Sequence, residues 1–177
     1  MTKEELSMLE NGSIYRFTEI YPNVFRIENS AVHMDLLVGE HHALLFDTGY
    51  GFDDLHGLVR RITNLPLYVV NSHGHVDHAA GNWQFGEVFI HPADVPVCIE
   101  HNGREMRMAE METAVLPENF DLEGYLSRDC GHLRQWGRAM CSILAALRWM
   151  WWSSPAIPPV PSDFTGGSGR SSMWAML

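Results

Sequence analysis

A chain of 177 residues is long enough for one compact domain with a hydrophobic core. Hydrophobic residues make up 46% of it and charged residues 19%, which is typical of globular proteins and excludes an intrinsically disordered chain. The net charge of −10 argues against nucleic acid as a partner, because a phosphate backbone needs a positively charged protein surface.

The N-terminal segment 1–13 contains no apolar signal region, so we do not expect secretion. The three cysteines, Cys98, Cys130 and Cys141, are odd in number and widely spaced, which is not the pattern of a disulfide framework. Both features favour a cytoplasmic protein.

The first half of the chain predicts strands. Segments 14–20 and 23–28 alternate apolar and polar residues, and we expect them to form a β-hairpin joined at Tyr21-Pro22. Segments 31–39 and 42–47 predict two further strands with a turn at 39–41. The strand series then ends at Asp47-Thr48-Gly49.

Helices alternate with strands farther along the chain. Asp53 or Asp54 is suited to cap a helix that runs to about Thr63. Segment 67–71 is a short apolar run, typical of a strand buried on both faces, and 87–91 predicts another strand. Pro92 suits the first turn of the next helix, and we interpret 100–112 as a helix or a lid. This order of elements predicts an α/β sandwich.

The segment His73-Gly74-His75-Val76-Asp77-His78 carries the candidate chemistry. Extended backbone sends residues i and i+2 to the same side, so His73 and His75 are placed to bind one metal ion. If a helix begins after Val76, Asp77 and His78 lie at its start and face a second ion. Imidazole suits zinc, iron and similar metals, and a carboxylate completes such a site.

Other polar residues receive a more ordinary interpretation. An Asp at a strand end followed by Thr-Gly usually forms a turn. Asp47 and Asn71 are also candidates to orient the metal ligands by hydrogen bonds. The remaining histidines are interpreted as surface or packed residues: His33, His41, His42, His56, His91, His101 and His132.

Residues 73–78 fit the H-x-H-x-D-H signature, and the chain therefore resembles the metallo-β-lactamase superfamily, with the glyoxalase II-like hydrolases among its members. Phe46-Asp47-Thr48-Gly49 is similar to the upstream strand-end motif of that family, and the resemblance covers about residues 12–125. It implies an αββα sandwich, of which this chain supplies an incomplete version.

The same resemblance implies the activity. In that family His73 and His75 would bind the first metal and Asp77 and His78 the second, with Asp77 also orienting the attacking water as the catalytic residue. Zinc is the expected cofactor, as one or two ions, with iron or manganese as alternatives. A metal-bound hydroxide would attack an ester, thioester or amide-type bond of a small-molecule substrate, because a bound cation lowers the pKa of water to about 7.

The C-terminal part differs in composition. Residues 1–128 hold 20 acidic and 8 basic residues, a net of −12, whereas 129–177 hold two acidic and four basic ones, a net of +2, and five of the six tryptophans. The family needs further ligands downstream, a histidine in a P-G-H-T-P-G-S-like loop and an aspartate in a G-D-like turn, and 129–177 contain neither. We therefore divide the chain into the N-terminal part of a metallo-β-lactamase-like domain, 1–128, and an atypical, partly disordered tail, 129–177.

A shift of reading frame accounts for this tail. Tryptophan and methionine have one codon each, so their DNA sequence is known. When the last base of each codon is joined to the first two bases of the following codon, Trp149-Met150-Trp151-Trp152 becomes D-V-V. In the same shifted frame, the possible codons of Ser154 to Pro161 are compatible with the residues P-G-H-T-P-G-S, and the codons of Met173-Trp174-Ala175 encode V-G. We hypothesise that the frame slips between about Leu126 and Trp136, which resequencing of the DNA would test.

Alternatives remain open at this point. Segment 139–152 has the composition of an interfacial membrane helix but is too short to span a bilayer, which needs about 20 residues. Segment 153–172 is rich in Pro, Gly and Ser and predicts disorder. For function, the alternatives to a hydrolase are a non-catalytic truncated remnant and an iron-dependent oxidoreductase on the same fold.

Overall fold

A computed structural model describes residues 13–112 and 114–136 of the chain. The predictions for 139–152 and 153–172, and the residues that carry the frame-shift hypothesis, lie outside these ranges. No helix in the described ranges is long and apolar enough to cross a membrane.

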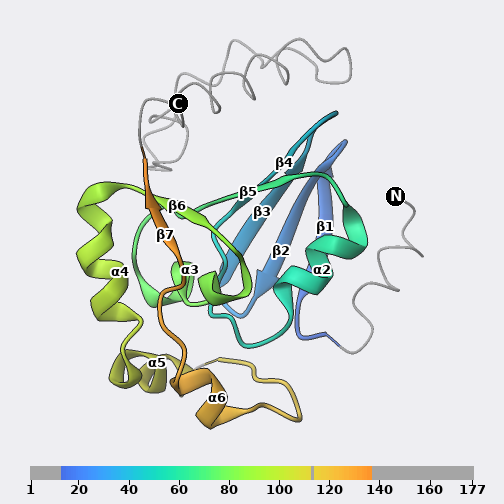
Figure 1. The fold of residues 1–177 in the computed structure, drawn as a ribbon. Helices are drawn as coiled ribbons and strands as arrows, with labels where there is room; N and C mark the ends of the chain where they lie inside the picture. The colour runs from blue at the N-terminus through green and yellow to red at the C-terminus, as the bar shows by residue number, and fades with distance from the viewer. Residues whose placement is uncertain (1–12, 113, 137–177) are drawn as a thin grey trace, which may run out of the picture. The chain divides into compact units, whose positions relative to one another are not determined.

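Four antiparallel strands open the structure (Figure 1). They are β1 (Arg16–Tyr21), β2 (Val24–Asn29), β3 (Val32–Val38) and β4 (Ala43–Phe46), each paired with the next in the chain. The β1–β2 turn passes through Asn23 at φ 64°, a left-handed conformation that asparagine tolerates better than most residues. The predicted hairpin, its turn and the next two strands are therefore confirmed.

Helices and parallel strands follow. The elements are α2 (Leu55–Ile62), β5 (Leu67–Val70), α3 (Val76–Ala79), η1 (Asn82–Gln84), β6 (Val88–Ile90), η2 (Pro92–Asp94), α4 (Val95–His101), α5 (Arg104–Met111), α6 (Leu122–Leu126) and β7 (Leu133–Gln135). Strands β4 to β7 are paired in parallel, so the seven strands form one mixed sheet in the order of the chain. Strand β7 lies in the segment that the sequence marked as atypical, yet Leu133 pairs with Val88 of β6.

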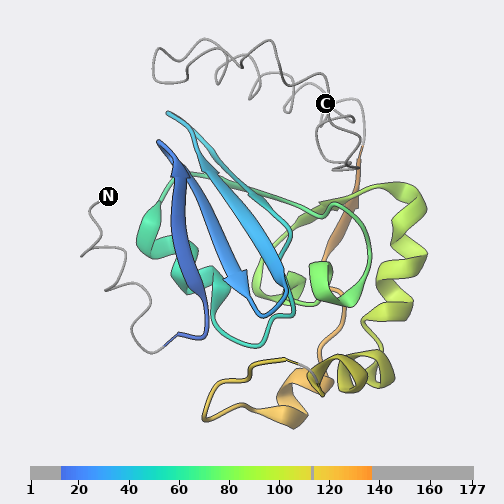
Figure 2. The ribbon, with the colours of Figure 1, turned by 180° about the vertical axis from the view of Figure 1, so that it is seen from behind.

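Helix α2 covers one face of the sheet. Asp54 caps it by accepting a hydrogen bond from the Gly57 amide at 2.7 Å, and Leu55, Leu58 and Val59 on one side of the helix are buried. They pack against apolar strand residues that include Phe25, Ile27, Met34, Leu36 and Leu45. Figure 2 shows the opposite face of β1 to β4, over which no described helix lies.

The observed sheet accounts for one half of the expected αββα sandwich. A mixed sheet with helices is present, and a second sheet is not found among the described residues. The fold is thus a partial one.

One strand differs from its prediction. Segment 67–71 was expected to be buried on both faces, but Leu67 and Tyr68 are only half-buried, while Val69 and Val70 are buried. The reason is a cavity of about 330 Å³ that opens beside the start of β5, with Arg60 of α2 and Phe89 of β6 among its lining residues.

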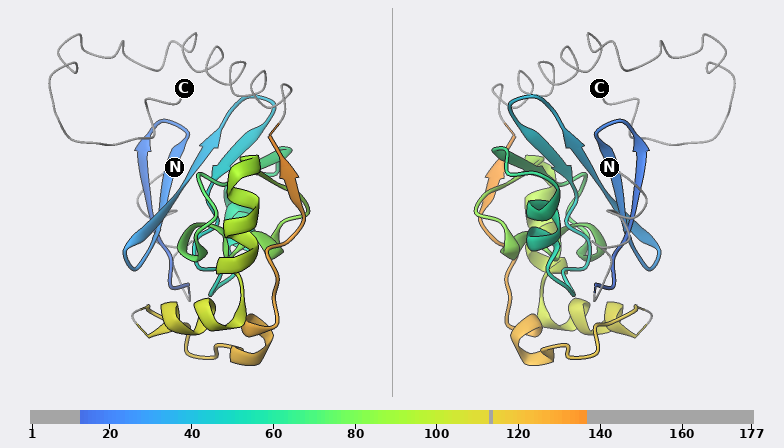
Figure 3. Two further views of the ribbon diagram at one scale, coloured as in Figure 1. Left: turned by 90° about the vertical axis from the view of Figure 1, so that its left-hand side faces the viewer. Right: turned by 90° about the vertical axis from the view of Figure 1, so that its right-hand side faces the viewer.

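The loops after β4 and β5 meet at one edge of the sheet because parallel strands end on the same side. Asp47 follows β4, and the segment from Asn71 to α3 follows β5. Helices α4 and α5 pack against α3, and α6 packs against α5. Figure 3 shows α5 and α6 together at one end of the described part of the chain.

Candidate metal centre

Three of the four predicted ligands converge. One ligand atom from each of His73, Asp77 and His78 lies within 4.8 Å of the others, and all three side chains are half-buried. His73 comes from the loop after β5, while Asp77 and His78 lie in the single turn of α3. The expected helix start after the extended segment is therefore present.

A single carboxylate, that of Asp47, stands behind both histidines of this group. Its Oδ2 lies 2.9 Å from His78 Nδ1 and accepts a hydrogen bond from Ser72 Oγ at 2.8 Å. Ser72 Oγ also lies 3.0 Å from His73 Nδ1. The serine proton is used on Asp47, so the contact with His73 requires Nδ1 to be the donor. In both rings Nε2 therefore points away from these partners and is available to bind a metal ion.

The backbone of Asp47 is held in an unusual conformation. Its φ is 63°, in the left-handed region that residues other than glycine rarely adopt. The Asp47 amide donates to the Val70 carbonyl at 2.9 Å, and Oδ1 accepts from the Ser72 amide at 2.7 Å. Asp47 thus ties the end of β4 to the loop after β5, a constraint that offsets the cost of the strained backbone.

The carbonyl of His78 is fixed as firmly as its ring. It accepts hydrogen bonds from the Thr48 amide at 2.9 Å and from Asn71 Nδ2 at 3.2 Å. Asn71 Oδ1 in turn accepts from Asn82 Nδ2 at 2.8 Å, and Asn71 is fully buried. Asn71 therefore supports α3 through its backbone and does not contact a ligand side chain.

Two neighbouring carboxylates favour the protonated form of His78. Burial disfavours its charged form, but hydrogen bonds with Asp47 and Asp77 and the negative charge of both carboxylates outweigh burial and raise the pKa of His78 to about 10. Asp77 Oδ2 lies 3.4 Å from His78 Nε2, and this partner holds the pKa of Asp77 below its usual value despite partial burial. Burial, helped by the charges of His78 and His75, lowers the pKa of His73. A cation at His78 Nε2 would take the place of a proton.

His75 lies beside this group and has a different neighbour. It is exposed, its ring centroid is 4.6 Å from that of His73, and it does not belong to the three-residue group. Its ring stacks on His101 at the end of α4, with centroids 4.6 Å apart and an interplanar angle of 6°. The sequence interpreted His101 as an ordinary surface or packed residue, because nothing local links position 101 to the motif.

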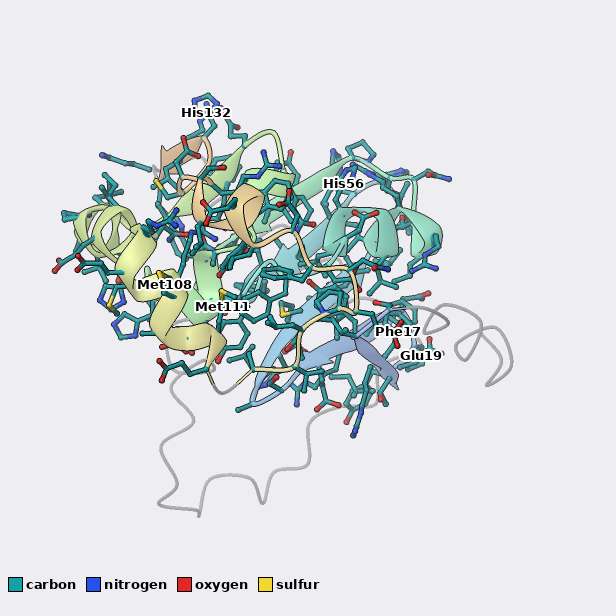
Figure 4. All side chains as sticks on the ribbon, turned by 90° about the horizontal axis from the view of Figure 1, so that it is seen from below. Phe17, Glu19, His56, Met108, Met111 and His132 are labelled. Carbon is teal, nitrogen blue, oxygen red and sulfur yellow. The ribbon has the colours of Figure 1, made fainter. Side chains whose placement is uncertain are left out.

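Sequence reasoning also missed Ser72. Its position directly before His73 was the available signal, since a hydroxyl there can reach the adjacent imidazole. Other histidines have ordinary surroundings. His56 packs edge-on against Phe85, and His132 is exposed; Figure 4 labels both, on α2 and before β7. On α5, Met111 packs against an apolar cluster, while Met108 is 51% exposed.

The family assignment follows from the comparison with protein families. The model of the metallo-β-lactamase superfamily matches residues 31–129, which is more than half of the chain. The chain belongs to the metallo-β-lactamase superfamily. A comparison with curated proteins found no match.

The solved structures that resemble this metallo-β-lactamase superfamily member have low sequence identity to it. The metallo-β-lactamase from Hirschia baltica has 16% identity and a TM-score of 0.43, covering 49% of this chain and 47% of its own. The enzyme from Pontibacter korlensis has 21% identity and a TM-score of 0.39, covering 59% and 51%. The chain spans about half the length of these two structures.

The residues present fit the kind of metal that the superfamily binds. Two imidazoles with Nε2 turned away from Asp47 and Ser72, together with one carboxylate, form a nitrogen and oxygen donor set that zinc accepts. Three protein ligands leave room for a water or substrate, as catalytic zinc sites do. Iron and manganese accept similar donors, so the residues by themselves do not select one metal.

Proposed function

We propose that this chain carries the metal-binding half of a metal-dependent hydrolase that cleaves an ester, thioester or amide-type bond of a small molecule. In this proposal His73, His75, Asp77 and His78 bind one or two ions, zinc in the first place. The convergence of His73, Asp77 and His78 within 4.8 Å, inside the segment that matches the superfamily, supports it.

Each residue has a distinct role in this proposal. A bound zinc ion would lower the pKa of a coordinated water to about 7, which supplies a nucleophile at neutral pH. Asp77 is ionised at neutral pH, and its lowered pKa keeps it ionised at still lower pH, so its carboxylate is available to orient a water molecule by accepting a hydrogen bond. Asp47 orients the imidazoles of His78 and, through Ser72, of His73. Asn71 holds the backbone of α3.

We further propose that residues 1–128 are the N-terminal part of the hydrolase domain and that the frame slips between about Leu126 and Trp136, so that the chain after the slip is read out of frame. The absence of the downstream ligands from 129–177 supports this division. A DNA sequence whose alternative frame lacks the P-G-H-T-P-G-S and G-D motifs would overturn it.

A second candidate is a truncated remnant without catalytic activity. The absence of the downstream histidine and aspartate ligands from 129–177 favours it, because a metal ion held by an incomplete set of protein ligands is bound weakly. In this candidate the protein still binds a metal through the three-residue group, but weakly, and turns over no substrate.

Metal analysis of the purified 177-residue chain, with an ester and a lactam assay, separates these candidates. The hydrolase proposal predicts zinc retained after dialysis and zinc-dependent turnover, both lost in His78→Ala and kept in His132→Ala, whose side chain is exposed. Zinc without turnover favours the remnant, and coloured protein with bound iron favours redox chemistry. Zinc retained equally by His78→Ala would contradict the site itself.

A further inference from the structure

A buried arginine occupies the space behind the ligand loop, which we define as residues 72–78. The side chain of Arg107, on α5, has no exposed surface. It donates to the carbonyls of Ala80, Asn102 and Asp129 at 3.1–3.2 Å and to Asn102 Oδ1 at 2.7 Å. Every one of these acceptors is neutral.

A buried guanidinium without a carboxylate partner is uncommon, because removing a charge from water is costly unless an opposite charge compensates. Among the described residues, Nη1 of Arg107 has no hydrogen-bond partner. The Tyr125 ring lies 4.7 Å from the guanidinium carbon and supplies a cation–π contact, but that contact carries no full negative charge. The buried charge of Arg107 therefore has no full negative charge among these hydrogen-bond partners.

Two cysteines from distant parts of the chain meet beside this arginine. Cys98 of α4 is fully buried, and Cys130, in the segment before β7, is half-buried and packs against the cluster that contains Cys98. The two thiols interact with each other, and both lie close enough to interact electrostatically with Arg107. Of the two, Cys130 is the one that solvent reaches.

The other neighbours of Cys98 indicate which of the two thiols is able to donate its proton to the other. Its sulfur receives amide hydrogens from Asn102 Nδ2 at 3.6 Å and from Asn82 Nδ2 at 4.0 Å. These amides only donate, so the S–H proton of Cys98 remains available to Cys130. Donation of this proton toward Cys130 lowers the pKa of Cys130 to about 7, with Arg107 acting in the same direction, and raises the pKa of Cys98. Cys130 is thus the reactive thiolate and Cys98 its protonated partner.

We propose that Cys130 and Cys98 form a redox-sensitive modification site, in which a peroxide oxidises Cys130 and Cys98 then closes a disulfide behind the ligand loop. The thiolate of Cys130 attacks one peroxide oxygen, a sulfur–oxygen bond forms, the oxygen–oxygen bond breaks, and hydroxide leaves. The sulfur of Cys98 then attacks the Cys130 sulfenic acid, the second hydroxide leaves, and the thiol proton of Cys98 ends on it. Two thiols and one hydrogen peroxide give one disulfide and two waters.

The position of the pair connects it to the ligand loop. A Cβ added at Gly74 would lie 2.6 Å from the Cys98 amide nitrogen, so α4 packs directly on the loop at this cysteine. Arg107 also binds the carbonyl of Ala80, directly after α3. A disulfide at this place would therefore join α4 and the β7 segment immediately behind the loop.

Peptide mapping of the full chain tests the proposal. The reduced protein is treated with hydrogen peroxide, free thiols are blocked with N-ethylmaleimide, and the chain is digested with trypsin. Cys98, Cys130 and Cys141 then fall in separate peptides, 62–104, 129–134 and 139–148. We expect 62–104 linked to 129–134, with a loss of two hydrogens that dithiothreitol reverses.

Single variants separate the two steps. Cys98→Ser should stop at a sulfenic acid on Cys130, trapped by dimedone, and Cys130→Ser should consume peroxide about tenfold more slowly than the wild type. Cys141→Ser, the matched control, should form the same linked peptides as the wild type. Circular dichroism identifies variants that fold like the wild type. An oxidised wild type in which 62–104 and 129–134 remain unlinked, or in which Cys141 takes up the oxidant, would overturn the proposal.

Discussion

Asp47 and His78 lie 31 residues apart in the sequence, yet the carboxylate Oδ2 of Asp47 and the imidazole Nδ1 of His78 are 2.9 Å apart. The same Oδ2 accepts from Ser72, whose oxygen contacts His73. One carboxylate thus orients both imidazoles of the three-residue group, and its left-handed backbone is the local cost of that position.

Replacing Asp47 by Asn should weaken zinc binding by about 10–100-fold, the usual effect of removing the partner of a ligand histidine. The amide keeps the volume of the side chain but lacks the negative charge that fixes the His78 ring. Competition with a chromophoric chelator measures the dissociation constant. Asp35→Asn is the matched control, because the carboxylate of Asp35 forms its ion pair with Arg26 and not with a ligand histidine. Equal affinities in Asp47→Asn and wild type would show that the carboxylate does not support the site.

His75 and His73 should differ in their contribution to the first metal ion. His73 belongs to the three-residue group, so His73→Ala should lower zinc affinity by more than the about 10–100-fold expected for a supporting residue. His75 stacks on His101 instead, and His75→Ala and His101→Ala should each cost less than His73→Ala. Isothermal titration with zinc compares the three variants. An equal loss in His75→Ala and His73→Ala would show that the stacking on His101 does not weaken the contribution of His75 to the ion.

Local signals were sufficient for most of the fold. The alternation in 14–28 predicts β1 and β2 because a strand exposes every second side chain, and Asp54 predicts the start of α2 because its carboxylate satisfies a free amide. The ligand segment was equally local, since four potential ligands lie within six residues. The extent of burial at the start of β5 was misjudged, because it depends on what packs beside the strand, and no strand was predicted at the position of β7.

Long-range contacts explain what the sequence did not reveal. The i, i+2 rule placed His75 beside His73, but residue 75 immediately precedes α3, and the approach of α4 to Gly74 brings His101 against it. The Cys98–Cys130 pair and the buried Arg107 likewise depend on how α4, α5 and the β7 segment pack. No pattern within any one of these segments indicates its partner.

Gly81 should be intolerant of any side chain. A Cβ there would lie 2.3 Å from the Thr48 carbonyl oxygen, a backbone atom held by the sheet edge, although the φ of −84° suits any residue. Gly81→Ala should therefore destabilise the protein by about 1–3 kcal/mol, as overpacking does. Gly86→Ala is the control, since a Cβ there meets nothing within 4 Å. Thermal unfolding should show a lower Tm for Gly81→Ala only, and equal Tm values would contradict the close approach.

Alkylation of Cys130 should depend on pH in a way that reports the interaction of its thiol with Cys98. Its pKa is lowered to about 7, so the thiolate predominates above that pH and is lost as the pH falls through it. The rate of iodoacetamide labelling, followed on peptide 129–134, should therefore reach half its maximum near pH 7. Cys98→Ala removes the donor and should move this midpoint up toward about 8.5, the value of an ordinary thiol. Cys141→Ser should leave it unchanged. A wild-type midpoint already near that of an ordinary thiol, or one that does not move in Cys98→Ala, would show that Cys98 does not stabilise the thiolate.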